Sequence, residues 1–127
     1  MRYLLVVAAI LFAAAAGASP DYHKMSRCIA TVESGNDPVA VGDGNRAAGT
    51  HQLWKIAVRE CNRLGGSFTY ADRFDPDKSH KMCVLLLTHY HRKYPKDSDL
   101  QLMYRWRNPN GKAPSWYKKR IKEEWTR

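Results

Sequence analysis

Residues 32–53 read VESGNDPVAVGDGNRAAGTHQL, and the interpretation of the whole chain starts from this stretch. A short apolar approach carries one acidic residue, Glu33, and then meets the sequence Gly35-Asn36-Asp37-Pro38. Glycine permits a left-handed helix cap and proline cannot continue a helix, so a helix is expected to end here. A glycine-rich loop follows, and after it the polar cluster Gly49-Thr50-His51-Gln52. The pattern predicts a glutamate in the last turn of a helix, facing a loop.

Helical periodicity dominates the sequence on both sides of this stretch. Apolar residues recur at the three- and four-residue spacing of one helix face, whereas patterns typical of strands are nearly absent. The predicted helices span residues 21–34, about 50–64, 76–94, about 97–106 and 115–125. The segment at 68–76 is expected to be irregular. We therefore expect a mainly α fold in a single domain.

The first eighteen residues have the layout of a secretory signal peptide. Arg2 supplies a positive start, residues 3–16 form an apolar run, and Ala16-Gly17-Ala18 fits a small-x-small cleavage site. The run is shorter than the roughly 20 residues that cross a bilayer. We expect cleavage before Ser19, a folded domain at residues 19–127, no integral membrane segment after cleavage, and a secreted or periplasmic location.

The chain is basic, with a formal net charge of +9 at pH 7. An exported basic domain is attracted to polyanions such as cell-wall polymers or anionic lipid, although excess charge also serves solubility alone. No glycine-rich phosphate loop and no basic-aromatic array typical of nucleic-acid binding is present. Charge therefore indicates where the protein is found and not what it does, and the missing motifs lead us to expect no nucleic-acid partner.

Three cysteines, Cys28, Cys61 and Cys83, leave their pairing open. An odd number in an exported chain allows one bridge with one free thiol, or no bridge. Cys61–Cys83 would join two neighbouring helices, whereas the apolar surroundings of all three fit buried free cysteines equally. The same apolar surroundings argue against a nucleophilic role for a cysteine.

Metal and cofactor binding are not indicated. No Cys or His spacing typical of zinc occurs. His80, His89 and His91 lie in one predicted helix, but His89 and His91 are two residues apart and point to different faces. We predict no metal site and no cofactor.

Glu33 is the leading candidate for a catalytic group. A carboxylate in the last turn of a helix meets the negative end of the helix dipole, so helix stability does not explain it. Partial burial beside Val32 would raise the pKa of its carboxyl, as a general acid at neutral pH requires. Gly42, Gly44 and Gly49 allow a ligand to approach the backbone closely. An exposed surface charge is nonetheless the simpler interpretation of Glu33 taken alone.

The spacing of the whole run resembles that of the lysozyme-like lytic transglycosylases. Glu33-Ser34-Gly35 is followed by Asn36, Pro38 and Ala40, and then by Gly49-Thr50-His51-Gln52-Leu53. This order is similar to the family signature of Glu-Ser at a helix end, an Asn-Pro-x-Ala loop and a Gly-x-x-Gln segment. Residues 54–63, 72–76 and 87–90 extend the likeness, which covers most of residues 19–127. The resemblance implies a lysozyme-like helical domain with a substrate groove.

The resemblance also implies a reaction and a partner. Glu33 would protonate the β-1,4 glycosidic oxygen between N-acetylmuramic acid and N-acetylglucosamine in peptidoglycan strands, and would then act as a base. Attack by the muramic 6-hydroxyl would give a 1,6-anhydro product, whereas attack by water would give hydrolysis. Inverting hydrolysis normally uses a second carboxylate, for which Asp37 and Asp43 are the candidates. Ser34 and Gln52 would contact substrate, and we expect a monomer.

Further substrate contacts are expected from Gly49, His51, Tyr104 and Asn108. His51 fits a structural histidine equally, and Tyr104 fits core packing. The family carries an asparagine that faces the glutamate. Alignment without a gap places that asparagine near Trp106, and a local shift of the chain would place Asn108 there. The departure from the family pattern at residues 106–108 also fits another interpretation, a non-catalytic lysozyme-like module that binds cell-wall glycan.

Overall fold

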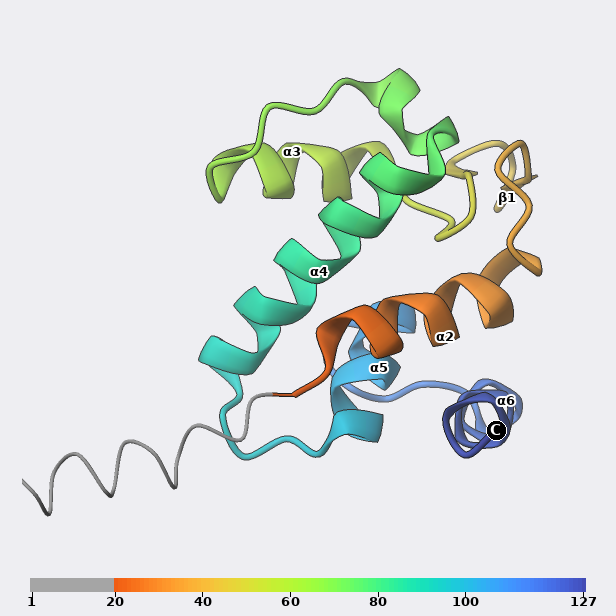
Figure 1. Cartoon of the computed structure of the whole chain (residues 1–127), viewed down its shortest axis with the longest axis vertical. Helices are drawn as coiled ribbons and strands as arrows, with labels where there is room; N and C mark the ends of the chain where they lie inside the picture. The colour runs from red at the N-terminus through yellow and green to blue at the C-terminus, as the bar shows by residue number, and fades with distance from the viewer. Residues whose placement is uncertain (1–19) are drawn as a thin grey trace, which may run out of the picture.

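The computed structural model describes residues 20–127, so the predicted signal peptide lies outside the described residues. Within them the chain is mainly helical, as predicted (Figure 1). The α-helices are α2 (Tyr22–Ser34), α3 (Lys55–Arg63), α4 (Pro76–Lys93), α5 (Asp99–Arg107) and α6 (Ser115–Trp125). A 3-10 helix, η1, spans Tyr70–Phe74. Two short strands, β1 (Val41–Gly42) and β2 (Ala47–Ala48), pair antiparallel as a hairpin that the sequence did not predict.

Helix α2 begins and ends where the sequence predicts. The Asp21 side chain accepts a hydrogen bond from the Lys24 backbone N–H at 2.9 Å, which caps the first turn. Gly35 closes the helix in a left-handed conformation with φ of 65°, and its N–H donates to the Thr31 carbonyl at 2.9 Å. Glu33, the penultimate residue of α2, is thereby fixed in the last turn of the helix.

Helix α3 starts at Lys55, so the prediction of a helix from Thr50 was wrong. Gln52 has a φ of +52°, which no helix permits. Its neighbour Leu53 exchanges two backbone hydrogen bonds with Ala48, at 3.1 and 3.0 Å, and so extends the hairpin. The left-handed Gln52 and the pairing of Leu53 with Ala48 therefore keep residues 50–53 out of the helix.

Arg73 holds the loops of this part of the fold together. It is buried within η1, and its Nη1 donates to the carbonyls of Arg46 and Leu53, both at 3.2 Å. Gly49 packs directly on the Arg73 backbone, since a Cβ at this glycine would lie 1.7 Å from the Arg73 carbonyl oxygen. The hairpin, the segment before α3 and η1 therefore form one packed unit.

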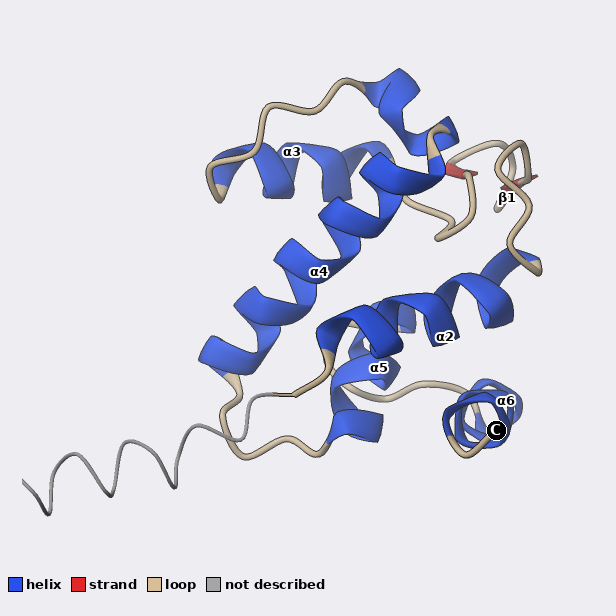
Figure 2. Cartoon of the chain, in the orientation of Figure 1, coloured by secondary structure: helices blue, strands red, loops and turns tan. Residues whose placement is uncertain are grey.

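Two hydrophobic clusters divide the molecule into two lobes. The larger cluster joins α2, α4, α5 and α6, and the smaller one joins α3 to α4. Figures 1 and 2 show α3, η1 and the hairpin on one side, α5 and α6 on the other, and α4 running between them. Tyr90 and Trp106 are partly buried and pack against both clusters. These two side chains mark the junction of the lobes.

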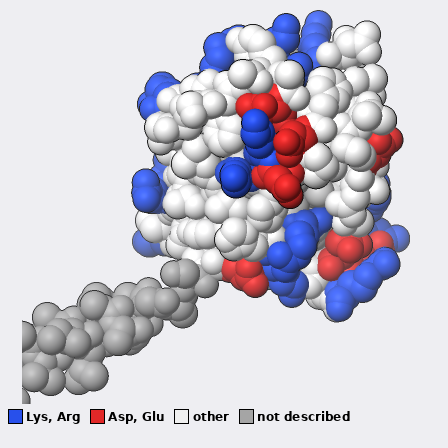
Figure 3. All heavy atoms as spheres, turned by 45° about the horizontal axis from the view of Figure 1, so that its top comes forward, with Lys and Arg blue, Asp and Glu red and all other residues white. Residues whose placement is uncertain are grey.

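Charged side chains are mixed over the surface. On the face in Figure 3, acidic residues gather near the middle together with Lys or Arg side chains, and further basic residues lie above, below and to the left of them. The net positive charge is thus not concentrated in one patch on that face. Within residues 20–127 no helix is long and apolar enough to span a membrane.

Candidate active site

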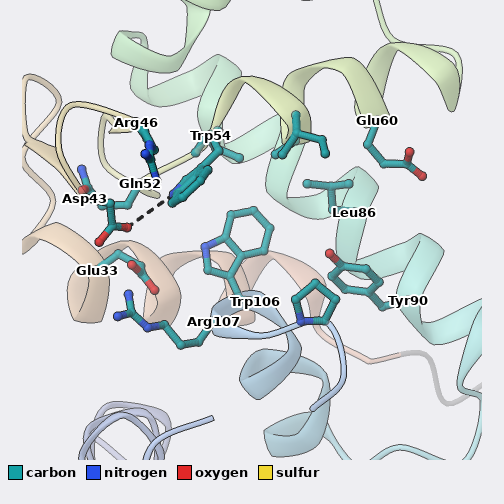
Figure 4. A pocket seen from close by; sticks show the side chains of 14 residues that line it. Glu33, Asp43, Arg46, Gln52, Trp54, Glu60, Leu86, Tyr90, Trp106 and Arg107 are labelled. Carbon is teal, nitrogen blue, oxygen red and sulfur yellow. Dashed lines mark hydrogen bonds between the residues drawn. The ribbon is translucent and has the colours of Figure 1, made fainter. Parts of the chain in front are cut away.

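A groove of about 790 Å³ runs along the junction of the two lobes. Its lining comes from the end of α2, the hairpin turn, the segment before α3, one face of α3, the middle of α4 and the end of α5. Figure 4 shows the charged and aromatic side chains that point into it. Glu33 is among them, so the structure places the predicted acid in an open groove between the lobes.

Glu33 is partly buried, and its surroundings raise the pKa of its carboxyl above the ordinary range. Loss of hydration is the largest cause, because burial disfavours the charged form. The negative charge of Asp43 acts in the same direction. A carboxyl in this environment keeps its proton to a higher pH than an exposed glutamate does.

Three neighbours of Glu33 oppose this effect. The Tyr117 hydroxyl on α6 is buried and makes no hydrogen bond of normal geometry within residues 20–127. It lies close enough to the Glu33 carboxyl to lower its pKa, and the positive charges of Arg107 and Arg120 act likewise. In return, burial and the Glu33 charge raise the pKa of the Tyr117 hydroxyl far above its ordinary value. The pKa of Glu33 is therefore raised by burial and by Asp43, and lowered in part by Tyr117 and the two arginines.

Of the two predicted second carboxylates, Asp43 lines the groove and Asp37 does not. Asp43 accepts a hydrogen bond from the Trp54 indole N–H at 3.4 Å, drawn dashed in Figure 4. The Arg46 guanidinium lies over the Trp54 ring, 5.5 Å from its centre. Asp37 instead accepts from the Val39 backbone N–H at 3.0 Å and shapes the turn after α2.

Gln52 lines the groove and is held by the hairpin. Its Nε2 donates to the carbonyls of Ala40 and Gly49, at 3.1 and 2.9 Å. Gly42 has to be small at this place, because a Cβ there would lie 2.6 Å from the Gln52 Oε1. Both amide hydrogen bonds fix the side chain, and the Oε1 remains available as an acceptor.

Ser34 is bound to the loop rather than directed into the groove. Its hydroxyl donates to the Thr50 carbonyl at 2.7 Å and accepts from the Asp37 backbone N–H at 3.1 Å. Ser34 thus connects the end of α2 with the segment that carries Gln52, and so fixes the backbone beside Glu33.

Gly49 and His51 lie beneath the groove surface. Gly49 is buried with a φ of +81° and packs on η1. His51 is 3% exposed and its ring is enclosed by hydroxyls, with Nε2 2.8 Å from Ser26 Oγ and Nδ1 2.8 Å from Thr50 Oγ1. Burial and the neighbouring His80 lower its pKa to about 4. The structural interpretation of His51 accordingly fits its surroundings.

Tyr104 and Asn108 do not line the groove either. Tyr104 is buried in the larger hydrophobic cluster, with the Lys118 ammonium 5.4 Å from its ring centre. Asn108 caps α5, and its Oδ1 accepts a hydrogen bond from the Asn110 N–H at 3.3 Å.

At the end of α5, Trp106 and Arg107 line the groove instead. The Trp106 indole N–H donates to the His51 carbonyl at 3.0 Å, so it is used within the fold. Figure 4 shows the Arg107 guanidinium beside the Glu33 carboxyl. The sequence analysis missed Arg107, Arg46 and Trp54 as groove residues. No local spacing identifies them, because their elements meet only in the folded chain.

The cysteines and histidines outside the groove have structural surroundings. All three cysteines are buried and free, so the Cys61–Cys83 bridge does not form. Burial raises the pKa of Cys28 to about 11 and that of Cys61 to about 12, which leaves no reactive thiolate. Within the described residues no three His, Cys, Asp or Glu side chains are grouped as metal ligands.

A groove between two helical lobes, with one partly buried glutamate at a helix end, is the arrangement expected of a lysozyme-like glycan-cleaving domain. Residues 10–109 match the family described as the transglycosylase SLT domain. The match covers most of the chain, and the protein belongs to this family, which confirms the predicted membership. No curated protein and no solved structure gives a significant match.

Proposed function

We propose that the protein cleaves the β-1,4 bond between N-acetylmuramic acid and N-acetylglucosamine in peptidoglycan, with Glu33 as the general acid and base. The observation that carries the proposal is the position of Glu33, partly buried and facing a groove built from both lobes. Membership in the transglycosylase SLT domain family supports the same reaction. Gln52, whose amide is fixed by the hairpin, is the proposed neighbouring contact to substrate.

The reaction begins when Glu33 donates its proton to the glycosidic oxygen and the bond to the muramic first carbon breaks. The leaving sugar keeps the proton as its 4-hydroxyl, and positive charge develops at that first carbon. The Glu33 carboxylate then removes the proton of the muramic 6-hydroxyl, whose oxygen attacks the same carbon. A 1,6-anhydro ring forms and Glu33 regains its proton, so one residue serves both steps. Water in place of the 6-hydroxyl gives hydrolysis.

Digestion of purified peptidoglycan tests the proposal. The parent protein should release muropeptides, and Glu33→Gln should lower the rate by roughly 100-fold or more, because a positioned acid contributes about that factor. Glu123→Gln is the matched control, since Glu123 is exposed on α6. Mass spectrometry of the released ends separates 1,6-anhydro products from reducing ends. A Glu33→Gln protein as active as its parent contradicts the proposal.

The raised pKa of Glu33 adds a pH dependence. The acid works only while protonated, so the rate should fall as the pH rises through that raised value, above the ordinary glutamate value of about 4.3. A rate profile measured on soluble glycan strands would show this basic limb. A limb at or below the ordinary value would mean that another group donates the proton.

A second candidate function is a glycan-binding module without turnover. The observation behind it is that Arg107, a cation that favours the ionised form of Glu33, lies beside Glu33 and directly follows Trp106, near which alignment without a gap would place the family's asparagine. This alternative predicts saturable binding to peptidoglycan with no released products. Turnover that is lost in Glu33→Gln excludes it.

Export belongs to the same proposal. Residues 1–18 are proposed as a cleaved signal peptide and residues 19–127 as the catalytic domain that reaches the wall. Mass spectrometry of the exported protein should give Ser19 as its first residue. An exported chain that still begins at Met1 would contradict cleavage.

A further inference from the structure

Two arginines enter the groove from opposite walls beside the proposed acid. Arg46 comes from the hairpin turn and Arg107 is the last residue of α5, and both line the groove. Figure 4 shows them on either side of the Glu33 and Asp43 side chains. They come from different lobes, so a strand lying in the groove would pass between them.

The N–H donors of both guanidinium groups are unused by the described part of the fold. Within residues 20–127, neither side chain makes a hydrogen bond or ion pair, although Glu33 and Asp43 line the same groove. Other arginines differ in this respect, since Arg105 pairs with Asp97. The donors of the two groove arginines are therefore open to a ligand.

Each guanidinium is instead positioned by an indole ring. Arg46 lies 5.5 Å from the ring centre of Trp54, and Arg107 lies 5.5 Å from that of Trp116. Such a cation–π contact holds the guanidinium near the ring without using its N–H donors. A guanidinium held in this way is prepared for two parallel hydrogen bonds to a carboxylate, the geometry that arginine favours.

We propose that Arg46 and Arg107 bind carboxylate groups carried by the muramic units of the glycan, and so make the groove selective for anionic over uncharged amino-sugar strands. This inference rests on the proposed function, because it names the substrate chemistry of the same groove. Two sources supply such carboxylates: the lactyl ether of a muramic unit without peptide, and the peptide of a unit that carries one.

Binding of a carboxylate to Arg107 would also change the pKa of Glu33. The Arg107 charge lowers the pKa of Glu33 in the free protein. A substrate anion that neutralises this charge removes part of that effect, so Glu33 holds its proton more firmly once substrate is bound. Selectivity and proton donation would then depend on the same arginine.

Binding measurements in a Glu33→Gln background test the inference without cleavage of the ligand. The probes are peptide-stripped strands, peptide-bearing strands, the same two with their carboxylates converted to methylamides, and uncharged N-acetylglucosamine oligomers. Neutralising the carboxylates should weaken binding at least about tenfold, the effect of losing a charge-assisted hydrogen bond. Whichever strand loses more affinity identifies the source of the carboxylate.

Substitutions assign the effect to the two arginines. Arg46→Gln combined with Arg107→Gln should bind charged and neutralised strands equally, and the two lysine replacements should restore part of the difference by charge alone. Arg92→Gln is the matched control, because Arg92 is exposed on α4 and does not line the groove. Far-ultraviolet circular dichroism of each variant checks that it is folded.

Equal binding of charged and neutralised strands by the parent would overturn the inference. So would an Arg92→Gln effect as large as that of the groove arginines, since net charge would then explain the result. If Glu33-dependent cleavage persists without charge selectivity, the inference alone fails. If charge-selective binding occurs without cleavage, the proposed activity fails and the arginine assignment stands.

Discussion

Replacing His51 by glutamine should make the protein less stable at neutral pH and more stable under acidic conditions. The His51 Nε2 lies 2.8 Å from Ser26 Oγ and 3.1 Å from the Ser26 carbonyl oxygen, and Nδ1 lies 2.8 Å from Thr50 Oγ1. A glutamine amide reaches the place of Nε2 and keeps the contacts to Ser26. It has no atom in the place of Nδ1, so Thr50 loses a buried partner.

Two opposing magnitudes follow from this geometry. Leaving the Thr50 hydroxyl without its partner lowers the free energy of unfolding by about 1–2 kcal/mol at any pH. The pKa of His51 is lowered to about 4 by burial and by His80, against about 6.5 in the unfolded chain. Between these values the unfolded state binds a proton that the folded state does not, so stability falls as the pH falls from 6.5 toward 4. At pH 4.5 this lowers the parent's stability by about 2–3 kcal/mol, and glutamine removes the effect.

Urea unfolding at pH 7.5 and pH 4.5, followed by tryptophan fluorescence, measures both the cost of the lost Thr50 contact and the pH-dependent part of the stability. His51→Gln should be less stable than the parent by about 1–2 kcal/mol at pH 7.5 and more stable by about 1 kcal/mol at pH 4.5. Ionisable groups common to both proteins cancel in the difference. His89→Gln, at a partly exposed histidine on α4, controls for loss of an imidazole that is not enclosed. The same stability difference at both pH values would refute the reasoning.

Three further predictions concern the groove and the core. Gly49→Ala should lower the free energy of unfolding by at least about 3 kcal/mol, from overpacking on η1 and its left-handed φ. Gly44 is also left-handed, but a Cβ there would meet no atom within 4 Å. Gly44→Ala should therefore lower the free energy of unfolding by only about 1 kcal/mol, and equal losses for the two variants would contradict the steric argument. Tyr117→Phe should raise the pKa of Glu33 further, because the tyrosine hydroxyl lowers it, and a rate profile whose basic limb does not move up would oppose this. The buried cysteines should react with a thiol reagent only as fast as the protein unfolds, and rapid labelling of the native protein would argue against their burial.

The helices that the sequence predicts well have clear apolar periodicity, and α2 also has a local stop signal in Gly35. Helix α6 spans Ser115–Trp125 as predicted, and α2 ends at the predicted Gly35 cap. The failure at residues 50–54 has a different origin. Leu53 pairs with Ala48 across the hairpin, and Gln52 adopts a left-handed φ that its side chain does not favour. Such pairing depends on packing against η1, which no window of sequence contains.

The candidate site, like the fold, was predictable only in part. The spacing of Glu33 and Gln52 predicted two residues that do line the groove. Both lie in one continuous stretch of sequence, formed by the end of α2 and the loop after it. Sequence spacing does not show on which side of the backbone a residue lies, and His51 packs beneath the surface that Gln52 lines. Tyr104 and Arg107 lie on one helix, yet one enters the core and the other the groove. That distinction depends on how α5 packs, not on residue type.

The groups around Glu33 act on its pKa in opposite directions, as the proposed double role of acid and base would require. Burial at the end of α2 favours its protonated form, whereas Arg107 on α5 and Tyr117 on α6 favour the ionised form. The opposite wall, held by Arg73 and the hairpin, contributes Gln52, Arg46 and Asp43 near Glu33, whereas its other groove carboxylate, Glu60, lies at the far end of the groove. A carboxylate of the substrate bound by Arg107 would favour the protonated form before bond cleavage. In the proposed reaction, Tyr117 and Arg120 would then stabilise the Glu33 carboxylate until the 6-hydroxyl returns a proton.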